Sequence, residues 1–147
     1  MIRVIIADDF PALESVMEEL ITAAGDMTLT GVATRLEEAL ELVKTEPHDV
    51  MVLDDYLPPL RSPDVIRRMR AEGVESAIVV ISMHRDAELA RDVLIAGASG
   101  FILKPNFMDE FVEGIRRAYA GEKFSSPEIV DALRALLGNT AHELLGV

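Results

Sequence analysis

The sequence contains no cysteine among its 147 residues. This absence excludes disulfide bonds, a thiolate nucleophile and zinc sites built on cysteine. Histidine is also scarce, and the three histidines are too scattered along the chain to suggest a metal site. Any metal-binding or covalent chemistry must therefore use carboxylates, hydroxyls or amines.

Long apolar runs and excess positive charge are missing as well. No run approaches the roughly 18 apolar residues of a membrane span, and the N-terminal MIRVII does not resemble a signal peptide. The 14 Lys and Arg against 26 Asp and Glu give a net charge of −12, which repels nucleic acid. We therefore expect a cytoplasmic protein with no membrane contact, whose residues do not bind DNA themselves. With 50% hydrophobic residues, the chain is long enough for one well-buried domain.

Strand-like and helix-like segments alternate along most of the chain. Apolar runs predict strands at 2–7, 28–33, 49–54, 77–82 and 100–104. Helical spacing and Pro or Gly boundaries predict helices at 11–24, 35–45, 64–72, 86–96 and 107–120. This alternation implies right-handed crossovers and a three-layer α/β/α domain. Five strands favour a flavodoxin-like, doubly wound parallel sheet with strand order 2-1-3-4-5.

Residues 122–147 do not fit this alternation. Ser126 is a candidate helix N-cap, and an apolar stripe follows it at Ile129, Val130, Leu133, Leu136 and Leu137. One interpretation is an extra C-terminal helix that packs on its own domain. The other is a linker or dimerisation helix leading to a domain absent from this chain. We therefore divide the chain into a domain at 1–121 and a C-terminal extension at 122–147.

Four of the predicted strands end on polar residues suited to phosphate chemistry. These residues are Asp8 and Asp9, Asp54, Ser82 and Lys104. Ligands of open parallel sheets collect at the carboxyl ends of the strands, so we expect these side chains to lie together. Clustered carboxylates either take up a proton or bind a cation, and an all-oxygen ligand set suits Mg²⁺. A carboxylate beside Mg²⁺ can be the nucleophile of phosphoryl transfer, with Lys104 as a counter-charge and Ser82 as a hydrogen-bond donor.

Four stretches resemble the receiver domain of two-component response regulators. They are ADDFP (7–11), VLDDYLP (52–58), VISMH (80–84) and GASGFILKP (97–105), and the resemblance covers residues 1–121. Within that family, the segments DDFP, SMH and GASGFILK resemble those of the LuxR/NarL (FixJ-type) transcriptional regulators. GEKFSSPEIVDAL (121–133) resembles the linker that follows the receiver in that subfamily. The resemblance implies a phosphorelay protein with a sensor histidine kinase partner, a homodimer, and DNA binding only through a helix-turn-helix domain absent from this chain.

The resemblance also implies roles for individual residues. Asp54 would become a 4-aspartylphosphate, with Ser82 and Lys104 contacting the phosphoryl oxygens. Phe101 would be the aromatic switch residue that follows the state of Ser82. The bland alternative for Phe101 is a core position, because it lies within a predicted strand.

The same resemblance implies that Asp8, Asp9, Asp54 and the backbone carbonyl of Tyr56 hold Mg²⁺. Asp55 is the rival of Asp54 as acceptor. Adjacent strand residues point to opposite faces, so only one of the two should face the acidic pair. The position four residues before Pro58 favours Asp54.

Two departures keep alternatives open. Pro59 and Ser62 stand where the family usually has glycine, and Pro63 follows, so we expect a stiffer loop and altered partner recognition or kinetics. This loop leaves room for a pseudo-receiver interaction module that is never phosphorylated. A phosphohydrolase of the haloacid dehalogenase type is a weaker alternative, because it needs an acid at the position of Tyr56. We therefore expect a signalling protein with only stoichiometric self-phosphorylation and slow self-dephosphorylation, not an enzyme.

Overall fold

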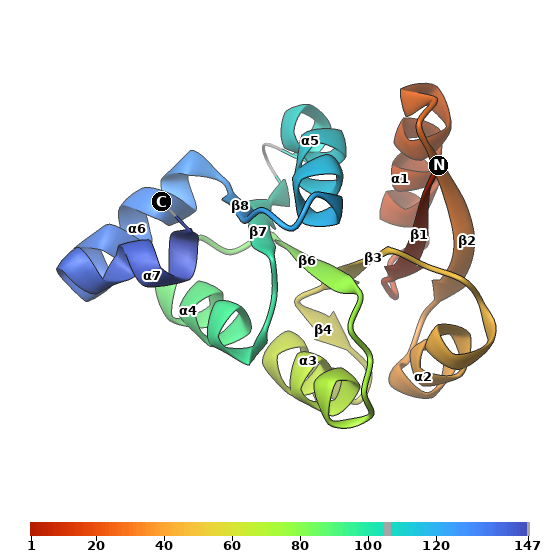
Figure 1. The fold of residues 1–147 in the computed structure, drawn as a ribbon, viewed down its shortest axis with the longest axis horizontal. Helices are drawn as coiled ribbons and strands as arrows, with labels where there is room; N and C mark the ends of the chain where they lie inside the picture. Colours follow the sequence, from red (N-terminus) through yellow and green to blue (C-terminus); the bar gives the residue numbers. More distant parts are fainter. Residues whose placement is uncertain (105–106, 147) are drawn as a thin grey trace.

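The computed structural model describes residues 1–104 and 107–146 (Figure 1). Pro105, which ends the last of the quoted motifs, and Val147, the last residue of the predicted extension, lie outside the described residues. Within the described ranges, no helix has the length and apolar character needed to cross a membrane.

A six-stranded parallel sheet forms the centre of the molecule. Its strands are β1 (Ile2–Ala7), β2 (Met27–Ala33), β3 (Val50–Asp54), β6 (Ala77–Ser82), β7 (Gly100–Leu103) and β8 (Phe124–Ser125). They are ordered β2-β1-β3-β6-β7-β8. The first five strands confirm the predicted order 2-1-3-4-5. The short β8 was not predicted, and it pairs in parallel with Gly100 and Phe101 at the edge of β7.

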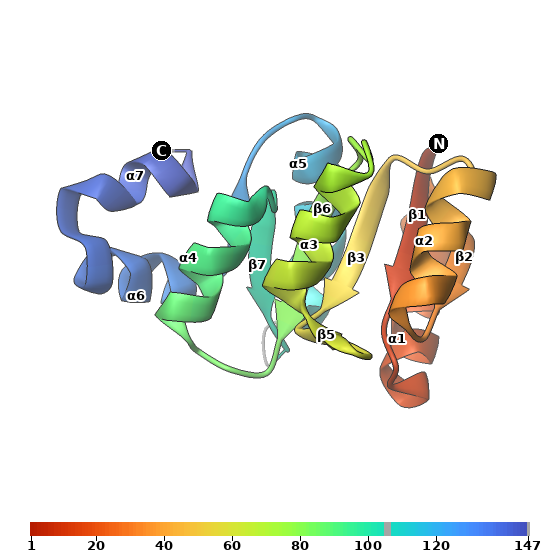
Figure 2. The ribbon, with the colours of Figure 1, turned by 90° about the horizontal axis from the view of Figure 1, so that it is seen from below.

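Helices cover both faces of the sheet, which confirms the three-layer architecture (Figures 1 and 2). One face carries α1 (Pro11–Ala24) and α5 (Phe107–Tyr119), and the other carries α2 (Leu36–Thr45), α3 (Ser62–Ala71) and α4 (Ala87–Ala96). Alternate strand residues enter the two cores: Val4 and Ile6 pack on the α1 side, and Ile5 packs on the α2–α4 side. Burial on both faces explains why the inner strands β3, β6 and β7 are continuous apolar runs.

The helix boundaries follow local sequence signals. Pro11 occupies the first turn of α1, and Gly25 ends that helix with a φ of 81°. The Asp86 side chain accepts a 3.1 Å hydrogen bond from the Leu89 amide at the start of α4, and Gly97 ends α4 with a φ of 118°. Both glycines adopt the left-handed conformation that disfavours other residues. The predicted helices are therefore present, with boundaries shifted by no more than two residues.

In this structure, the C-terminal extension packs on its own domain. It contains β8, α6 (Pro127–Leu137), a short 3₁₀ turn (Gly138–Thr140) and α7 (Ala141–Leu145). Helix α6 packs against α4, and its Ile129 and Leu133 are fully buried in the core on the α2–α4 side.

Ser126 stands at the N-cap position of α6, but its hydroxyl makes no capping bond. Its Oγ instead accepts a 2.9 Å hydrogen bond from the amide of Leu103 and donates a short one to a carboxylate oxygen of Glu110. Its own amide donates to the Phe101 carbonyl at 3.0 Å. The predicted N-cap position is therefore confirmed, although the hydroxyl bonds elsewhere and does not cap the helix. The hydroxyl is fully buried beside β7, where it satisfies a backbone donor of that strand.

We expect Leu133→Ala to lower the free energy of unfolding by about 2 to 3 kcal/mol, because it leaves a cavity between α6 and the core. The matched control is Leu136→Ala on the same helix, where the side chain is 43% exposed and the loss should stay below about 1 kcal/mol. Urea denaturation measures both values. Equal, small losses would show that α6 does not pack on the domain in solution.

The proline-rich loop after β3 forms a small hairpin. Strands β4 (Tyr56–Leu57) and β5 (Leu60–Arg61) pair antiparallel, with a cis Pro58–Pro59 peptide at the turn. The Ser62 amide donates to the Asp55 carbonyl at 2.9 Å, and Leu57 is fully buried. The buried Ser62 hydroxyl has no hydrogen-bond partner in the described part of the chain.

Replacing Ser62 by alanine should raise the free energy of unfolding by about 1 kcal/mol, because a buried hydroxyl without a partner is desolvated for no gain. Ser76→Ala is the matched control, since the Ser76 hydroxyl lies 2.9 Å from Nε2 of His48 and should lose stability. Urea denaturation of both variants tests the difference. Destabilisation by Ser62→Ala would mean that this hydroxyl has a partner in solution.

Candidate functional site

Three carboxylates converge at the carboxyl edge of the sheet. Asp8 follows β1 directly and Asp54 ends β3, and these neighbouring strands pair Ala7 with Leu53. One carboxylate oxygen from each of Asp8, Asp9 and Asp54 lies within 4.8 Å of the others. Asp8 and Asp54 are only 3% and 7% exposed, whereas Asp9 is open to solvent.

Lys104 provides the positive charge at this site. It follows β7, and its Nζ donates to Oδ1 of Asp54 at 2.9 Å. The same oxygen accepts the Asp55 amide at 2.8 Å. The structure therefore brings Lys104 to the carboxylate cluster from across the sheet.

The negative charge of the cluster is incompletely balanced. Burial, followed by the charge of Asp54, raises the pKa of Asp8 to about 7, although the Phe10 amide and Lys104 oppose the change. Burial also raises the pKa of Asp54, against the hydrogen bond and charge of Lys104. Two buried acids that resist ionisation together have the charge and the oxygen ligands that suit a divalent cation such as Mg²⁺. The residues present therefore fit this ion.

Ser82 is the last residue of β6, which pairs with β3 on the side away from β1. Its side chain is fully buried. Its hydroxyl donates to Oδ2 of Asp55 at 2.8 Å and accepts the amide of His84 at 3.1 Å. The sequence did not suggest this contact, because alternation separates Asp54 and Asp55. Asp55 lies in a bend just after β3, where strand alternation no longer applies, and that position was the available signal.

The structure places the remaining predicted residues, Phe101 and Tyr56, within a strand and in the hairpin. Phe101 lies within β7 opposite Val80 and is fully buried in the core on the α2–α4 side. Tyr56 opens the hairpin, where it pairs with Arg61, and its side chain is 45% exposed.

An apolar rim lies on the segments that follow β1, β3, β6 and β7. We define it by the exposed side chains of Phe10, Tyr56, Met83 and Met108. Each rim residue lies one to four positions after one of the predicted site residues. Exposed apolar side chains therefore occur on each of the segments that follow these four strands.

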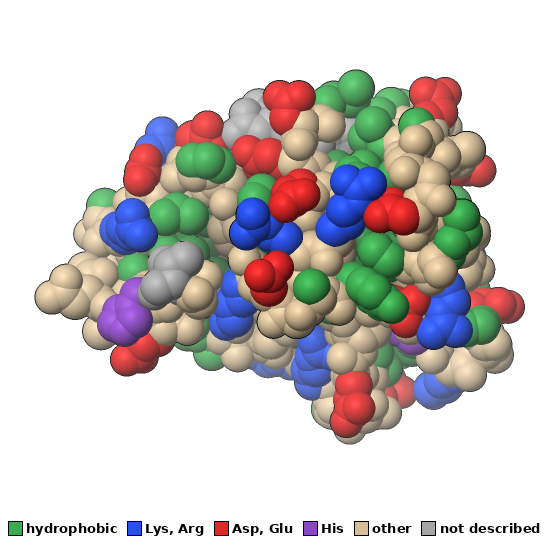
Figure 3. Space-filling model, turned by 45° about the horizontal axis from the view of Figure 1, so that its top comes forward, with side chains coloured by type: hydrophobic (Ala, Val, Ile, Leu, Met, Phe, Trp, Pro, Cys, Tyr) green, Lys and Arg blue, Asp and Glu red, His purple; other side chains and the backbone are tan. Residues whose placement is uncertain are grey.

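The face that carries α1 and α5 shows basic side chains interspersed with acidic ones (Figure 3). Arg116 pairs with Asp26 at 2.8 Å and Arg117 pairs with Glu113 at 2.7 Å. These two arginines are thus paired with acids of the same chain.

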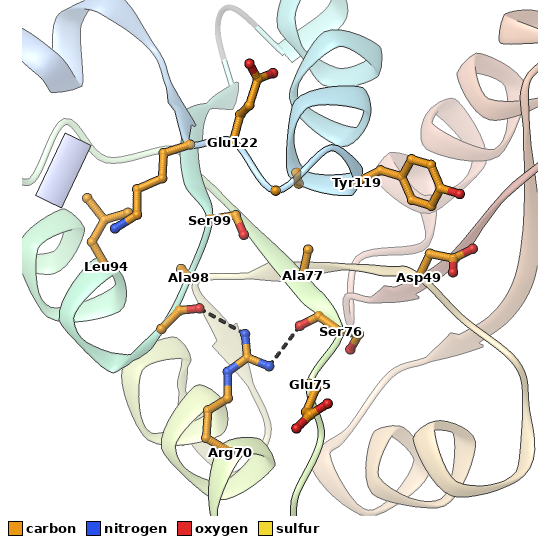
Figure 4. Close-up of a pocket in the computed structure, with 14 residues that line it drawn as sticks. Asp49, Arg70, Glu75, Ser76, Ala77, Leu94, Ala98, Ser99, Tyr119 and Glu122 are labelled. Atoms are coloured by element: carbon orange, nitrogen blue, oxygen red, sulfur yellow. Dashed lines mark hydrogen bonds between the residues drawn. The ribbon is translucent and has the colours of Figure 1, made fainter. Parts of the chain in front are cut away.

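A hollow of about 600 Å³ lies at the opposite, amino edge of the sheet (Figure 4). Arg70 projects into it and donates to the carbonyls of Val74 and Ser76 at 2.8 Å and of Gly97 at 2.9 Å. These bonds tie the segments after α3 and α4 together. The hollow therefore has a structural arginine at its edge, and the acid cluster lies at the other end of the strands.

The chain is similar to known signalling proteins. The model of the response regulator receiver domain family matches residues 4–116. The chain is 28% identical over 134 residues to the nitrate/nitrite response regulator protein NarL of Escherichia coli K12, covering 91% of this chain and 62% of NarL. It is 31% identical over 130 residues to the uncharacterized transcriptional regulatory protein YvfU of Bacillus subtilis, covering 88% of this chain and 64% of YvfU. The chain thus spans less than two thirds of either relative.

Solved structures agree with this similarity. A LuxR-family two-component response regulator from Aurantimonas superimposes with a TM-score of 0.84 at 26% identity, covering 91% of this chain and 96% of that chain. The signal receiver domain of the response regulator NarL from Mycobacterium tuberculosis gives a TM-score of 0.76 at 27% identity, covering 82% of this chain and 98% of that chain.

Proposed function

Because the chain belongs to the family of response regulator receiver domains, we propose that it is a phosphorelay switch that accepts a phosphoryl group on Asp54. Members of this family are signalling domains, not turnover enzymes. The observation that carries the proposal is the buried Asp54 carboxylate, held between the acidic pair and the Lys104 ammonium group.

The proposed donor is the phosphohistidine of a sensor histidine kinase. An Asp54 oxygen attacks the phosphorus, an O–P bond forms, and the N–P bond breaks with the kinase imidazole as leaving group. Asp8, Asp9, Asp54 and the Tyr56 carbonyl are the proposed Mg²⁺ ligands, and the ion supplies positive charge to the phosphoryl oxygens. The apolar rim is the proposed contact surface for the kinase.

Lys104 and Ser82 are the proposed hydrogen-bond donors to the phosphoryl oxygens. Lys104 already donates to Asp54, so a short movement of its flexible side chain carries it to a phosphoryl oxygen. The Ser82 hydroxyl donates to another oxygen, and Phe101 follows it as the switch residue. Phosphorylation thereby biases a two-state surface of the domain.

We propose that this surface is a homodimer interface on α1 and α5. Two observations favour it over the α4 side. Helix α6 packs on α4, and β8 pairs with the edge of β7, so the extension occupies much of that side. Helices α1 and α5 contact each other on the opposite face of the sheet.

The proposed output is transcription regulation through a LuxR-type helix-turn-helix DNA-binding domain. Such a domain lies outside these 147 residues, and the matched relatives are longer than this chain. We assign residues 1–121 to the receiver domain and 122–147 to the extension that precedes the output domain. Cytoplasmic localisation follows from contact with the kinase and with DNA.

The test is incubation with acetyl phosphate and Mg²⁺, followed by intact mass spectrometry and turnover measurement. The switch predicts the addition of one phosphoryl group per chain, dependent on Mg²⁺, and a change in association state. Absence of modification would favour a pseudo-receiver, and many turnovers on phosphate esters would favour a phosphohydrolase. Either outcome would overturn the proposal.

A further inference from the structure

The Ser82 hydroxyl is fully committed in this structure. Its single O–H donates to Oδ2 of Asp55 at 2.8 Å, and its oxygen accepts the His84 amide at 3.1 Å. The side chain is fully buried, so water does not offer an alternative partner. The orientation of the hydroxyl is therefore set by the two groups beside it.

The Ser82 hydroxyl can donate either to Asp55 or to a phosphoryl oxygen on Asp54, but not to both. A serine hydroxyl carries one proton to donate, although its oxygen can accept twice. While the proton lies on Asp55, it is not available to a phosphoryl oxygen on Asp54. A hydrogen bond to a charged acceptor is also among the stronger kinds, so its loss has a measurable effect.

Asp55 is well anchored for this task. Its amide donates to Oδ1 of Asp54 at 2.8 Å, and its carbonyl accepts the Ser62 amide at 2.9 Å. The backbone of Asp55 is therefore fixed between the acceptor residue and the hairpin. The side chain bridges from there to the end of β6, 27 residues along the chain.

We propose that Asp55 is a positioning residue that holds the Ser82 hydroxyl in the resting state and competes for its proton with the phosphoryl group on Asp54. This inference rests on the proposed function of Asp54. Its consequence is that Asp55 opposes the active state: the phosphoryl group must take the Ser82 proton away from a carboxylate. Removing that carboxylate shifts the switch toward its phosphorylated form.

The test is a double-mutant cycle read by beryllofluoride affinity at saturating Mg²⁺. Asp55→Ala should bind beryllofluoride about tenfold to a hundredfold more tightly than the wild type. In a Ser82→Ala background, Asp55→Ala should also raise the affinity for beryllofluoride, but by a factor at least about five times smaller. The reason is that no hydroxyl proton remains to be released. Asp55→Asn, which keeps the shape and an acceptor oxygen, should give a smaller gain that also depends on Ser82.

A second readout needs no ligand. Urea denaturation of the free protein should show a non-zero coupling between Asp55→Asn and Ser82→Ala. Equal affinity gains in both backgrounds would mean that Asp55 acts through its charge alone, and would overturn the inference. Absence of a gain, or absence of coupling in the free protein, would do the same. A wild type that does not bind beryllofluoride, or an Asp54→Asn variant that does, would instead overturn the proposed function and the inference with it.

Discussion

Asp54→Asn is expected to abolish Mg²⁺-dependent phosphoryl transfer to this chain, whereas Asp55→Asn leaves transfer intact or makes it faster. The carboxylate oxygen of Asp54 is the nucleophile beside the acidic pair and Lys104, and an amide oxygen does not replace it. Asp55 lies outside the carboxylate cluster, and its side chain is engaged with Ser82. Intact mass spectrometry after treatment with acetyl phosphate measures both variants.

The paired substitution is informative because the two residues are adjacent and change in the same way. Each variant loses one negative charge and keeps the shape of the side chain. Peptide mapping of the modified wild type should locate the phosphoryl group on Asp54. Modification that persists in Asp54→Asn and disappears in Asp55→Asn would reverse the assignment of the acceptor.

Without Mg²⁺, the free energy of unfolding should fall as pH rises from about 4 to about 7. Asp8 has a pKa of about 7 in the folded protein against 3.8 as its ordinary value, so the folded state holds this proton more tightly. The corresponding stability is fully present below about pH 4 and is lost as pH rises through about 7. The loss amounts to up to about 4 kcal/mol. The raised pKa of Asp54 acts in the same direction.

Asp8→Asn is the control for this pH dependence, because other acids also titrate. The Asp26 and Asp49 carboxylates, beside arginines, have lowered pKa values, and their contributions grow as pH rises from the acid side. Subtracting the Asp8→Asn curve from the wild-type curve removes these terms. Urea denaturation in EDTA at several pH values gives both curves. A difference that does not change with pH would contradict the raised pKa of Asp8.

Mg²⁺ should reverse the loss at alkaline pH, because the ion binds ionised carboxylates and stabilises the state to which it binds. The midpoint of thermal unfolding should therefore rise with Mg²⁺ at about pH 8 and change little at about pH 5. Asp8→Asn should reduce the response at both values. An equal response at both pH values would place the ion away from Asp8.

The layered fold was predictable because its signals are local and repeated. Strands such as β3 and β6 are apolar runs, and helices such as α1 carry a proline at the start and a glycine at the end. The two-residue strand β8 is too short for any periodicity, so the sequence did not suggest it. Ser126 was read as a cap from its neighbours in sequence, but its hydroxyl contacts Leu103, 23 residues away.

The site was predictable to the extent that strand ends define it. Asp8, Asp54, Ser82 and Lys104 each stand at the end of a strand or directly after it, and the parallel sheet places them together. The contact between Asp55 and Ser82 depends on how the chain bends after β3; the end of the strand was predictable, but the direction of that bend was not. Tertiary contacts of this kind are where sequence rules fail.

Ser126 connects β7 to the start of α6 through hydrogen bonds. Its amide donates to the Phe101 carbonyl, its Oγ accepts the Leu103 amide, and its hydroxyl donates to Glu110. These partners lie on β7 and α5. Lys104 follows Leu103 directly, so a pull on the lysine acts one residue from this anchor. The residue before α6 is thereby hydrogen-bonded to the strand residue that precedes Lys104. A displacement of Lys104 that reached Leu103 would therefore act directly on Ser126 and on the helix that begins after it.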